Sequence, residues 1–130
     1  MNLDCLLAER EIERMIVDYA AASDAGEWGR VAAMYAEEGR MNRPTAPDVF
    51  VEGRAAILAA FEARPARVSR HIVANIQVDV AGDEASATSQ ILLFTAAGQP
   101  PLVGSYQDRL VRTPEGWRFV ERRGSLDFAQ

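Results

Sequence analysis

The run Ser69-Arg-His-Ile-Val-Ala-Asn-Ile-Gln-Val-Asp-Val80 is the longest strand-like stretch in this chain of 130 residues. Before it, apolar residues recur at spacings of three and four, as in helices; from it onward the period is two, as in strands. Three further segments share this period, and short turns rich in Gly and Pro separate them. Long strands joined by short turns predict an antiparallel meander. The four predicted strands cover residues 69–80, 85–95, 102–112 and 117–126.

The residues before this run predict three helices. In the first, over residues 6–23, Ile12, Ile16 and Tyr19 fall on one face, and Gly26 is well placed to end the helix. Helices followed by strands predict an α+β protein, with three N-terminal helices packed on a curved, mainly antiparallel sheet. The remaining predicted elements are helices over residues 28–36, stopped by Gly39, and 54–63, stopped by Pro65, and short strands over residues 40–43 and 49–52.

Size and composition predict a single domain over residues 1–130 with an ordinary soluble core. The net charge is −5, and all 14 basic residues are Arg, scattered among acids, so we expect no nucleic-acid partner. No apolar run reaches the ~18 residues that a membrane span needs. The N-terminus has no basic flank, so we expect no signal peptide. Cys5 stands alone, which excludes an internal disulfide and favours a reducing, cytoplasmic location.

Several short motifs follow one another in a definite order. They are Ile12-x-x-Met15-x-x-x-Tyr19, Asp24-Ala-Gly-Glu-Trp28, Val51-Glu-Gly53, His71-Ile-Val-Ala-Asn75, Gly82-Asp83, Gly104-x-Tyr106-x-Asp108 and Gly116-Trp-Arg-Phe119. Through this ordered set the chain resembles the NTF2-like superfamily, specifically its SnoaL-like branch. That resemblance implies a cone-shaped α+β domain, a small-molecule cavity and a homodimer formed through the outer sheet face. The fold hosts dehydratases, isomerases, cyclases and non-catalytic binders, so it does not by itself define an activity.

Asp24 and His71 are the candidate catalytic residues. His71 is the only histidine, and it opens the long strand, while Asp24 lies in the turn that ends the first helix. They match the positions at which scytalone dehydratase and bile-acid dehydratases place an orienting Asp and a proton-transferring His. An imidazole can accept and return a proton near neutral pH, and a carboxylate can fix its tautomer. The alternatives are a strand-edge histidine satisfied by backbone or solvent, and an ordinary helix-terminal aspartate.

Other positions depart from the scytalone dehydratase pattern. Ser23 stands where that enzyme has a Tyr, its second pocket Tyr falls near Asn42 or Arg43, and its second His falls near Val103. The proton-transfer pair is therefore retained and the substrate-holding set is not. This favours a different small, apolar ring compound.

Aromatic residues are candidates for lining the cavity, with simple core packing as the alternative. Tyr106 is also a candidate hydrogen-bond donor to a ligand carbonyl, and Asp108, on the same strand face, fits a surface pairing with an Arg. The candidate substrate-binding residues are Tyr19, Trp28, Tyr35, Phe50, Phe61, Phe94 and Tyr106.

Strict alternation along residues 69–80 raises a problem. It places His71 with Val73, Asn75 and Gln77, opposite the more apolar set that begins at Ile72. Either a bulge changes the register, or the polar set lines the pocket while the apolar set packs elsewhere, such as in a dimer interface. We favour the second explanation.

The sequence therefore predicts a cofactor-independent acid–base enzyme of the dehydratase, isomerase or cyclase type. The alternatives are a non-catalytic ligand-binding protein or accessory subunit, and a purely structural dimerisation module. One His and one Cys are too few for a zinc site, and no glycine-rich phosphate loop is present, so we expect no metal and no cofactor.

Overall fold

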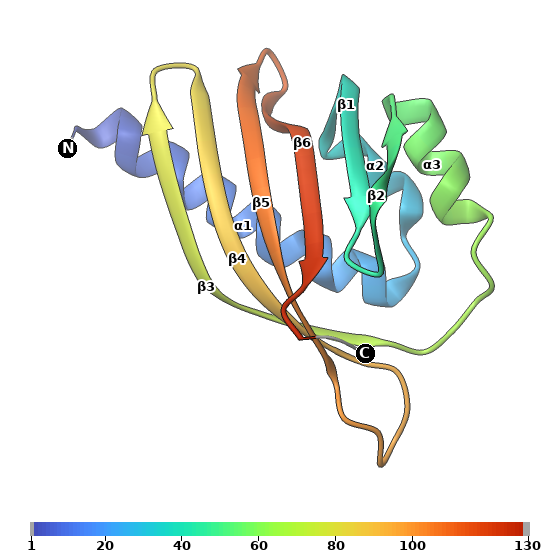
Figure 1. The fold of residues 1–130 in the computed structure, drawn as a ribbon. Helices are drawn as coiled ribbons and strands as arrows, with labels where there is room; N and C mark the ends of the chain where they lie inside the picture. The colour runs from blue at the N-terminus through green and yellow to red at the C-terminus, as the bar shows by residue number, and fades with distance from the viewer. Residues whose placement is uncertain (1, 129–130) are drawn as a thin grey trace.

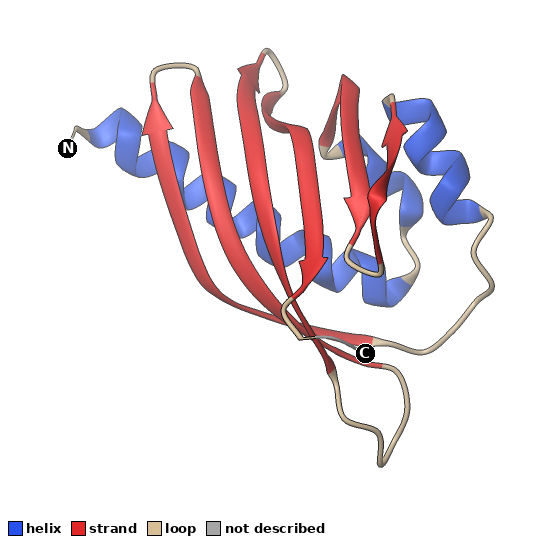
Figure 2. Ribbon diagram, viewed as in Figure 1, coloured by secondary structure: helices blue, strands red, loops and turns tan. Residues whose placement is uncertain are grey.

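The computed structural model describes residues 2–128 and confirms the predicted α+β class. Figure 2 shows helices gathered on one side of a single large sheet. No helix among these residues is long and apolar enough to cross a membrane. The elements are α1 (Leu3–Ala25), α2 (Trp28–Ala33), β1 (Tyr35–Arg43), β2 (Ala46–Glu52), α3 (Arg54–Glu62), β3 (Arg70–Ala81), β4 (Glu84–Phe94), β5 (Leu102–Thr113) and β6 (Gly116–Leu126).

The six strands form one mixed sheet in the order β2-β1-β6-β5-β4-β3. The predicted meander over β3 to β6 is confirmed, because each consecutive pair is antiparallel; only β1 and β6 pair in parallel. The long strands curve, α1 crosses one face of the sheet, and α2 and α3 lie beside β1 and β2 (Figure 1). A curved sheet covered by helices on one face leaves room for a cavity at one end.

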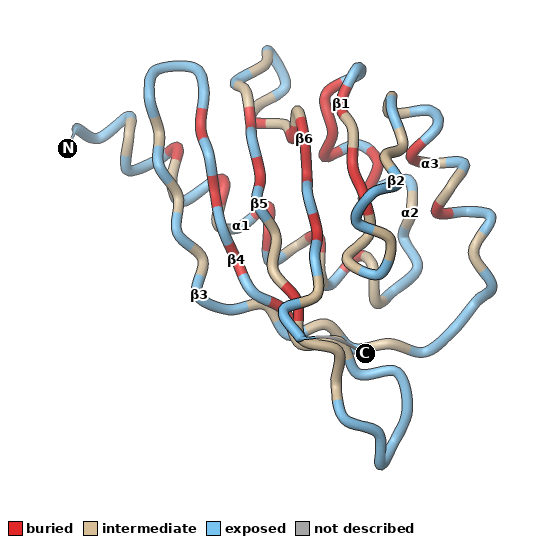
Figure 3. Tube along the Cα trace, in the orientation of Figure 1, coloured by how far each residue is buried: buried red, intermediate tan, exposed pale blue. Residues whose placement is uncertain are grey.

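The core lies between α1 and the inner face of the sheet, where buried positions alternate along the strands (Figure 3). Ile12 and Ile16 of α1 and Trp117 and Phe119 of β6 are at most 1% exposed. At roughly 25 cal/mol per Å² of apolar surface removed from water, side chains of this size supply most of the stability of the fold.

The two ends of α1 explain why it is longer than predicted. The helix begins at Leu3 because the side chain of Asn2 accepts a hydrogen bond from the Cys5 N–H at 2.8 Å. It ends at Gly26, which takes the left-handed conformation (φ 70°) and donates to carbonyls of the last turn, as predicted.

The predicted second helix was wrong at its C-terminal end. It stops at Ala33, and Tyr35 already belongs to β1, which is longer than the predicted strand. The cause is tertiary: Tyr35 pairs with Phe119, whose N–H donates to the carbonyl of Met34 at 2.8 Å. Gly39 is not a helix stop but lies inside β1, where a Cβ would sit 2.8 Å from the carbonyl oxygen of Phe119.

A bulge in β3 resolves the alternation problem, and the explanation we favoured from the sequence is wrong. The register between β3 and β4 shifts between Ala74 and Gln77, and Asn75 takes a left-handed conformation with φ 54°. His71 and Val73 therefore face inward before the bulge, whereas Ile76 and the following alternate residues face inward after it. Most of the apolar set thus packs in the core instead of forming an outer apolar face.

Candidate functional site

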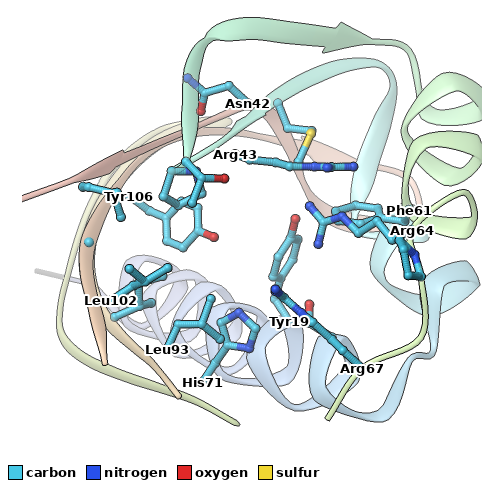
Figure 4. Close-up of a pocket in the computed structure, with 18 residues that line it drawn as sticks. Tyr19, Asn42, Arg43, Phe61, Arg64, Arg67, His71, Leu93, Leu102 and Tyr106 are labelled. Atoms are coloured by element: carbon cyan, nitrogen blue, oxygen red, sulfur yellow. The ribbon is translucent and has the colours of Figure 1, made fainter. Parts of the chain in front are cut away.

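A cavity of about 370 Å³ opens at the end of the sheet where β3 begins and α1 ends. Its residues come from α1, β1, the end of α3, the α3–β3 connection and the inner face of the sheet (Figure 4). The volume lies at the low end of the range for small-molecule pockets. Much of the wall is apolar, and it includes Met41, Phe61, Ile91, Leu93, Leu102 and Leu126.

Asp24 and His71 are in direct contact at this end of the molecule. Asp24 Oδ1 lies 2.6 Å from His71 Nδ1, and Asp24 Oδ2 accepts the backbone N–H of His71 at 2.8 Å. The Ser69 hydroxyl donates to Oδ1 at 3.1 Å. Both members of the pair are largely buried, with side chains 14% and 16% exposed. The carboxylate thus fixes the position and orientation of the ring.

The bond to Asp24 also determines what the other ring nitrogen can do. A carboxylate only accepts, so Nδ1 of a neutral His71 carries the proton and Nε2 keeps its lone pair. Among residues 2–128, Nε2 makes no hydrogen bond. The ring lines the cavity. The unprotonated nitrogen is therefore available to accept a proton from a bound molecule.

Two phenols, Tyr19 and Tyr106, line the same cavity. Burial raises the pKa of Tyr106 to about 12, although the nearby Arg122 opposes the shift. Burial likewise raises the pKa of Tyr19, whose hydroxyl lies 2.8 Å from that of Tyr35. Both phenols therefore stay protonated at neutral pH and can donate hydrogen bonds.

A buried ion pair lies beneath these two rings. Arg122 Nε donates to Asp108 Oδ1 at 3.1 Å, and the guanidinium carbon lies 3.8 Å from the ring centre of Tyr106 and 4.2 Å from that of Tyr19. Both side chains are at most 2% exposed, so the surface pairing expected for Asp108 is wrong. Burial raises the pKa of Asp108 to about 6, with Arg122 opposing. Burial alone lowers the pKa of Arg122, but Asp108 and Tyr106 raise it above its ordinary value.

Four of the seven predicted lining aromatics lie at or beside the cavity. Tyr19, Phe61 and Tyr106 line it directly. Trp28 stacks on Phe61, with ring centres 5.0 Å apart, and lines an adjoining hollow that also contains Asp24. His71 lines both spaces, so it stands at the boundary between them.

The other three predicted aromatics do not line the cavity. Tyr35 is fully buried behind Tyr19, in the core. Phe50 faces away from the core because its neighbour Val51 faces inward, and its ring lies beneath Arg40, 4.1 Å from the guanidinium carbon.

The prediction that Phe94 lines the cavity was also wrong, because successive side chains of a strand point to opposite faces. Leu93 points into the cavity, so Phe94 points to the outside, where it is 38% exposed. Side chains alternate between the two faces of a strand, and this alternation decides which aromatic residues reach the site. The sequence alone did not show which face of these segments points inward.

Three cavity residues, Arg43, Arg64 and Arg67, were missed. A local signal existed: residues 63–78 contain three arginines and no acidic residue, although the chain as a whole is acidic. Asn42 also lines the cavity, but its side chain bonds the backbone of Pro47 and Gly124. No group of three His, Cys, Asp or Glu side chains within the described range is placed to hold a metal ion.

The sequence matches the family model of the SnoaL-like domain over residues 4–123. An uncharacterized protein of Mycobacterium tuberculosis is 27% identical over 130 residues, with 86% of this chain and 80% of that protein covered. The name of that relative gives no activity.

Two similar solved structures come from Novosphingobium aromaticivorans. One is an NTF2-like protein with a cystatin-like fold, with a TM-score of 0.88 and 26% identity, covering 98% of this chain and 87% of that one. The other is a candidate scytalone dehydratase, with a TM-score of 0.81 and 28% identity, covering 95% and 86%. The similarity extends over nearly the whole architecture.

Proposed function

Because this chain belongs to the SnoaL-like domain family, we propose that it is a cofactor-independent acid–base enzyme acting on a small ring compound. The observation that carries the proposal is the contact between Asp24 and His71, whose ring lines a cavity with many apolar side chains in its wall. A positioned base with a free lone pair, an orienting carboxylate and a nearby phenol are the groups that enolisation requires.

The proposed first step is removal of a proton from a carbon next to a substrate carbonyl. His71 Nε2 takes the proton, and the electrons of the C–H bond move into the carbonyl to form an enolate. Asp24 stabilises the resulting imidazolium through Nδ1–H, at 2.6 Å in the resting structure. Tyr106 donates its phenol proton in a hydrogen bond to the enolate oxygen.

The atom to which His71 then delivers this proton distinguishes a dehydration from an isomerisation. In a dehydration, the carbonyl re-forms as the bond to a β-hydroxyl breaks, and the imidazolium protonates the departing oxygen to give water. In an isomerisation, the substrate carries a double bond next to the deprotonated carbon, so that a dienolate forms. The carbonyl re-forms, the double bond moves into conjugation with it, and the imidazolium returns the same proton to the γ carbon. Both routes need no external oxidant or reductant. A candidate scytalone dehydratase of similar structure supports the first route.

The direct test is turnover by His71→Gln and Asp24→Asn variants on a substrate found by screening cyclic ketones and hydroxyketones. Loss of a general base lowers turnover by about 100-fold or more. Asp48→Asn on the exposed part of β2 is the matched control, and it should retain wild-type activity. Retention of activity within about threefold in His71→Gln contradicts the proposal.

The second candidate is a ligand-binding protein without catalysis. The second pocket tyrosine of scytalone dehydratase falls near Asn42 or Arg43, and its second histidine falls near Val103. The Asn42 side chain is bonded to backbone, Arg43 is no phenol, and Val103 does not line the cavity. A smaller set of polar groups for holding substrate favours binding alone. Recovery of a tightly bound compound unchanged after long incubation would support this candidate over the enzyme.

The predicted homodimer through the outer sheet face stays a prediction. The bulge at Asn75 removes the apolar argument for it, since only the first part of β3 turns apolar residues outward. Sedimentation at several protein concentrations tests the oligomeric state directly.

A further inference from the structure

Three arginines gather on one side of the cavity. Arg43 comes from β1, and Arg64 and Arg67 come from the connection between α3 and β3. Figure 4 shows them across the cavity from Tyr106 and Leu102. Among the described residues, no Asp or Glu lines this space, although the chain has 19 acidic and 14 basic residues. The cavity therefore has the opposite charge balance to the whole protein.

No carboxylate neutralises these three guanidinium groups. Within residues 2–128, no Asp or Glu oxygen lies within the 4.0 Å that defines an ion pair with Arg43, Arg64 or Arg67. Elsewhere most arginines do contact a carboxylate, as Arg14 does with Asp18 at 3.1 Å. Arg10, Arg54 and Arg118 also lack such a partner among the described residues, but only in the cavity do three unpaired arginines line one space.

The contacts that the cavity arginines do make are uncharged. Arg43 Nη2 donates to the carbonyl of Ala60 at 3.2 Å, near the end of α3. The Arg64 guanidinium carbon lies 4.7 Å from the ring centre of Phe61. A helix C-terminus carries only about half a negative charge, so three arginines leave a net positive wall.

Crowding of these groups has an energetic cost. Burial, followed by the charges of Arg43 and Arg67, lowers the pKa of Arg64 to about 10. Arg64 thus remains charged at neutral pH while like charges repel it. A bound anion would offset this repulsion, so the crowded positive charges favour anion binding at this wall.

We propose that the cavity takes a ring compound bearing a carboxylate, with Arg64 and Arg67 holding the carboxylate and the apolar wall of Leu93 and Leu102 holding the ring. This inference rests on the proposed function because it takes the same cavity as the substrate site. A guanidinium fork matches the two oxygens of a carboxylate. A single carboxylate suits the limited volume and apolar lining better than a phosphate dianion, whose burial costs more.

The test is a binding measurement, which needs no turnover. Benzoate and its neutral analogue benzamide are titrated by calorimetry into the wild type and the variants Arg64→Met and Arg67→Met. Arg10→Met, on the exposed face of α1, makes the same charge change away from the cavity. Thermal unfolding confirms that each variant is folded, and Arg67, which is exposed, can be replaced without disturbing the core.

We expect wild-type protein to bind benzoate about tenfold more tightly than benzamide, since charge-assisted hydrogen bonds are the stronger kind. The preference should fall to near unity in Arg64→Met, fall in part in Arg67→Met, and persist in Arg10→Met. Equal binding of the two probes, or a preference unchanged in both cavity variants, overturns the proposal. So does failure of benzoate to bind at about 10 mM.

Two further experiments distinguish carboxylate binding from phosphate binding and from the proposed acid–base function. Inorganic phosphate that displaces benzoate at equal or lower concentration overturns the assignment to a carboxylate. His71→Gln should keep the benzoate preference while its turnover falls by about 100-fold or more. The binding measurement can therefore contradict the anion site while the turnover measurement supports the acid–base function. The opposite combination of results can be recognised in the same way.

Discussion

Asp24 contacts His71 at two points, with Oδ1 2.6 Å from the ring Nδ1 and Oδ2 2.8 Å from the backbone nitrogen. One contact fixes the tautomer and the other fixes the start of β3 against the end of α1. Segments 47 residues apart in the sequence are thereby joined at the cavity wall. A substitution at Asp24 therefore affects both the tautomer of His71 and the attachment of β3 to α1.

Asp24→Asn should change the tautomer of His71. An amide has one oxygen, and the backbone N–H of His71 cannot turn away, so that oxygen stays with the backbone. The amide NH₂ then faces Nδ1, which must accept, and the ring proton moves to Nε2. Because the chain has a single histidine, the ¹⁵N spectrum of its imidazole, recorded after removal of any affinity tag, reads this directly. The wild type should show the proton on Nδ1.

Asp18→Asn is the control, since Asp18 lies on α1 and pairs with Arg14. It should leave the imidazole spectrum unchanged. An Asp24→Asn spectrum identical to that of the wild type would show that the carboxylate does not set the tautomer.

Tyr106→Phe should reduce turnover while leaving the fold intact. The ring that covers Arg122 is kept, at 3.8 Å in the wild type, and only the hydroxyl donor is lost. Loss of one donor to a developing oxyanion lowers kcat by about 100-fold. Steady-state kinetics should place the effect on kcat and not on KM.

Tyr35→Phe serves as the comparison, because its hydroxyl bonds Tyr19 in the core and does not line the cavity. That variant should lose about 1 kcal/mol of stability and little activity. If Tyr35→Phe lowers kcat as much as Tyr106→Phe does, the phenol of Tyr106 has no special part in the reaction.

Asn75 should tolerate Gly far better than Val. Its φ of 54° is accessible to Asn and Gly, whereas a β-branched residue pays about 1–2 kcal/mol or more to adopt it. Urea unfolding should therefore show Asn75→Val destabilised by that amount and Asn75→Gly nearly unchanged. Gln77→Val, at an exposed position of the same strand, should not be destabilised. Equal effects of Val at both positions would mean that the bulge is not constrained by Asn75.

The elements that the sequence predicts well are those with strong local periodicity. The face of α1, its end at Gly26 and the meander from residue 69 all follow from spacing and turn residues. β1 was missed in part because its residues become a strand only by pairing with β6, which lies some 80 residues later. Local propensity contains no information on that pairing.

The candidate site was predictable to the extent that it rests on rare residues. His71 and Asp24 could be selected because one is the only histidine and the resemblance to scytalone dehydratase points to both positions. The inward direction of His71 could not, since it depends on a single extra residue at the bulge near Asn75. The local excess of arginine over residues 63–78 was visible in the sequence, but it did not show that Arg64 and Arg67 line the cavity without a carboxylate partner, because that depends on their three-dimensional neighbours.

Arg122→Met should make the stability depend on pH through Asp108. In the wild type, burial raises the pKa of Asp108 to about 6, and Arg122 is the charge that opposes a further rise. A carboxyl group whose folded pKa exceeds its unfolded value of about 4 stabilises the protein fully below that value. This stability is lost as the pH rises through the folded pKa. Removal of Arg122 moves that pKa higher, so the difference between variant and wild type should grow above about pH 6.

The measurement is urea unfolding of both proteins between about pH 5 and pH 8, at fixed ionic strength. The variant Arg122→Met with Asp108→Asn has no carboxyl group to titrate at this position, so its difference from Arg122→Met isolates the contribution of Asp108. A buried ion pair replaced on both sides is often close to neutral in stability, whereas one partner left alone is costly. The double variant should therefore be more stable than Arg122→Met at about pH 8 and approach it at about pH 5, where Asp108 of the single variant binds a proton. A difference between the two variants that is the same at every pH would mean that Asp108 does not titrate in this range.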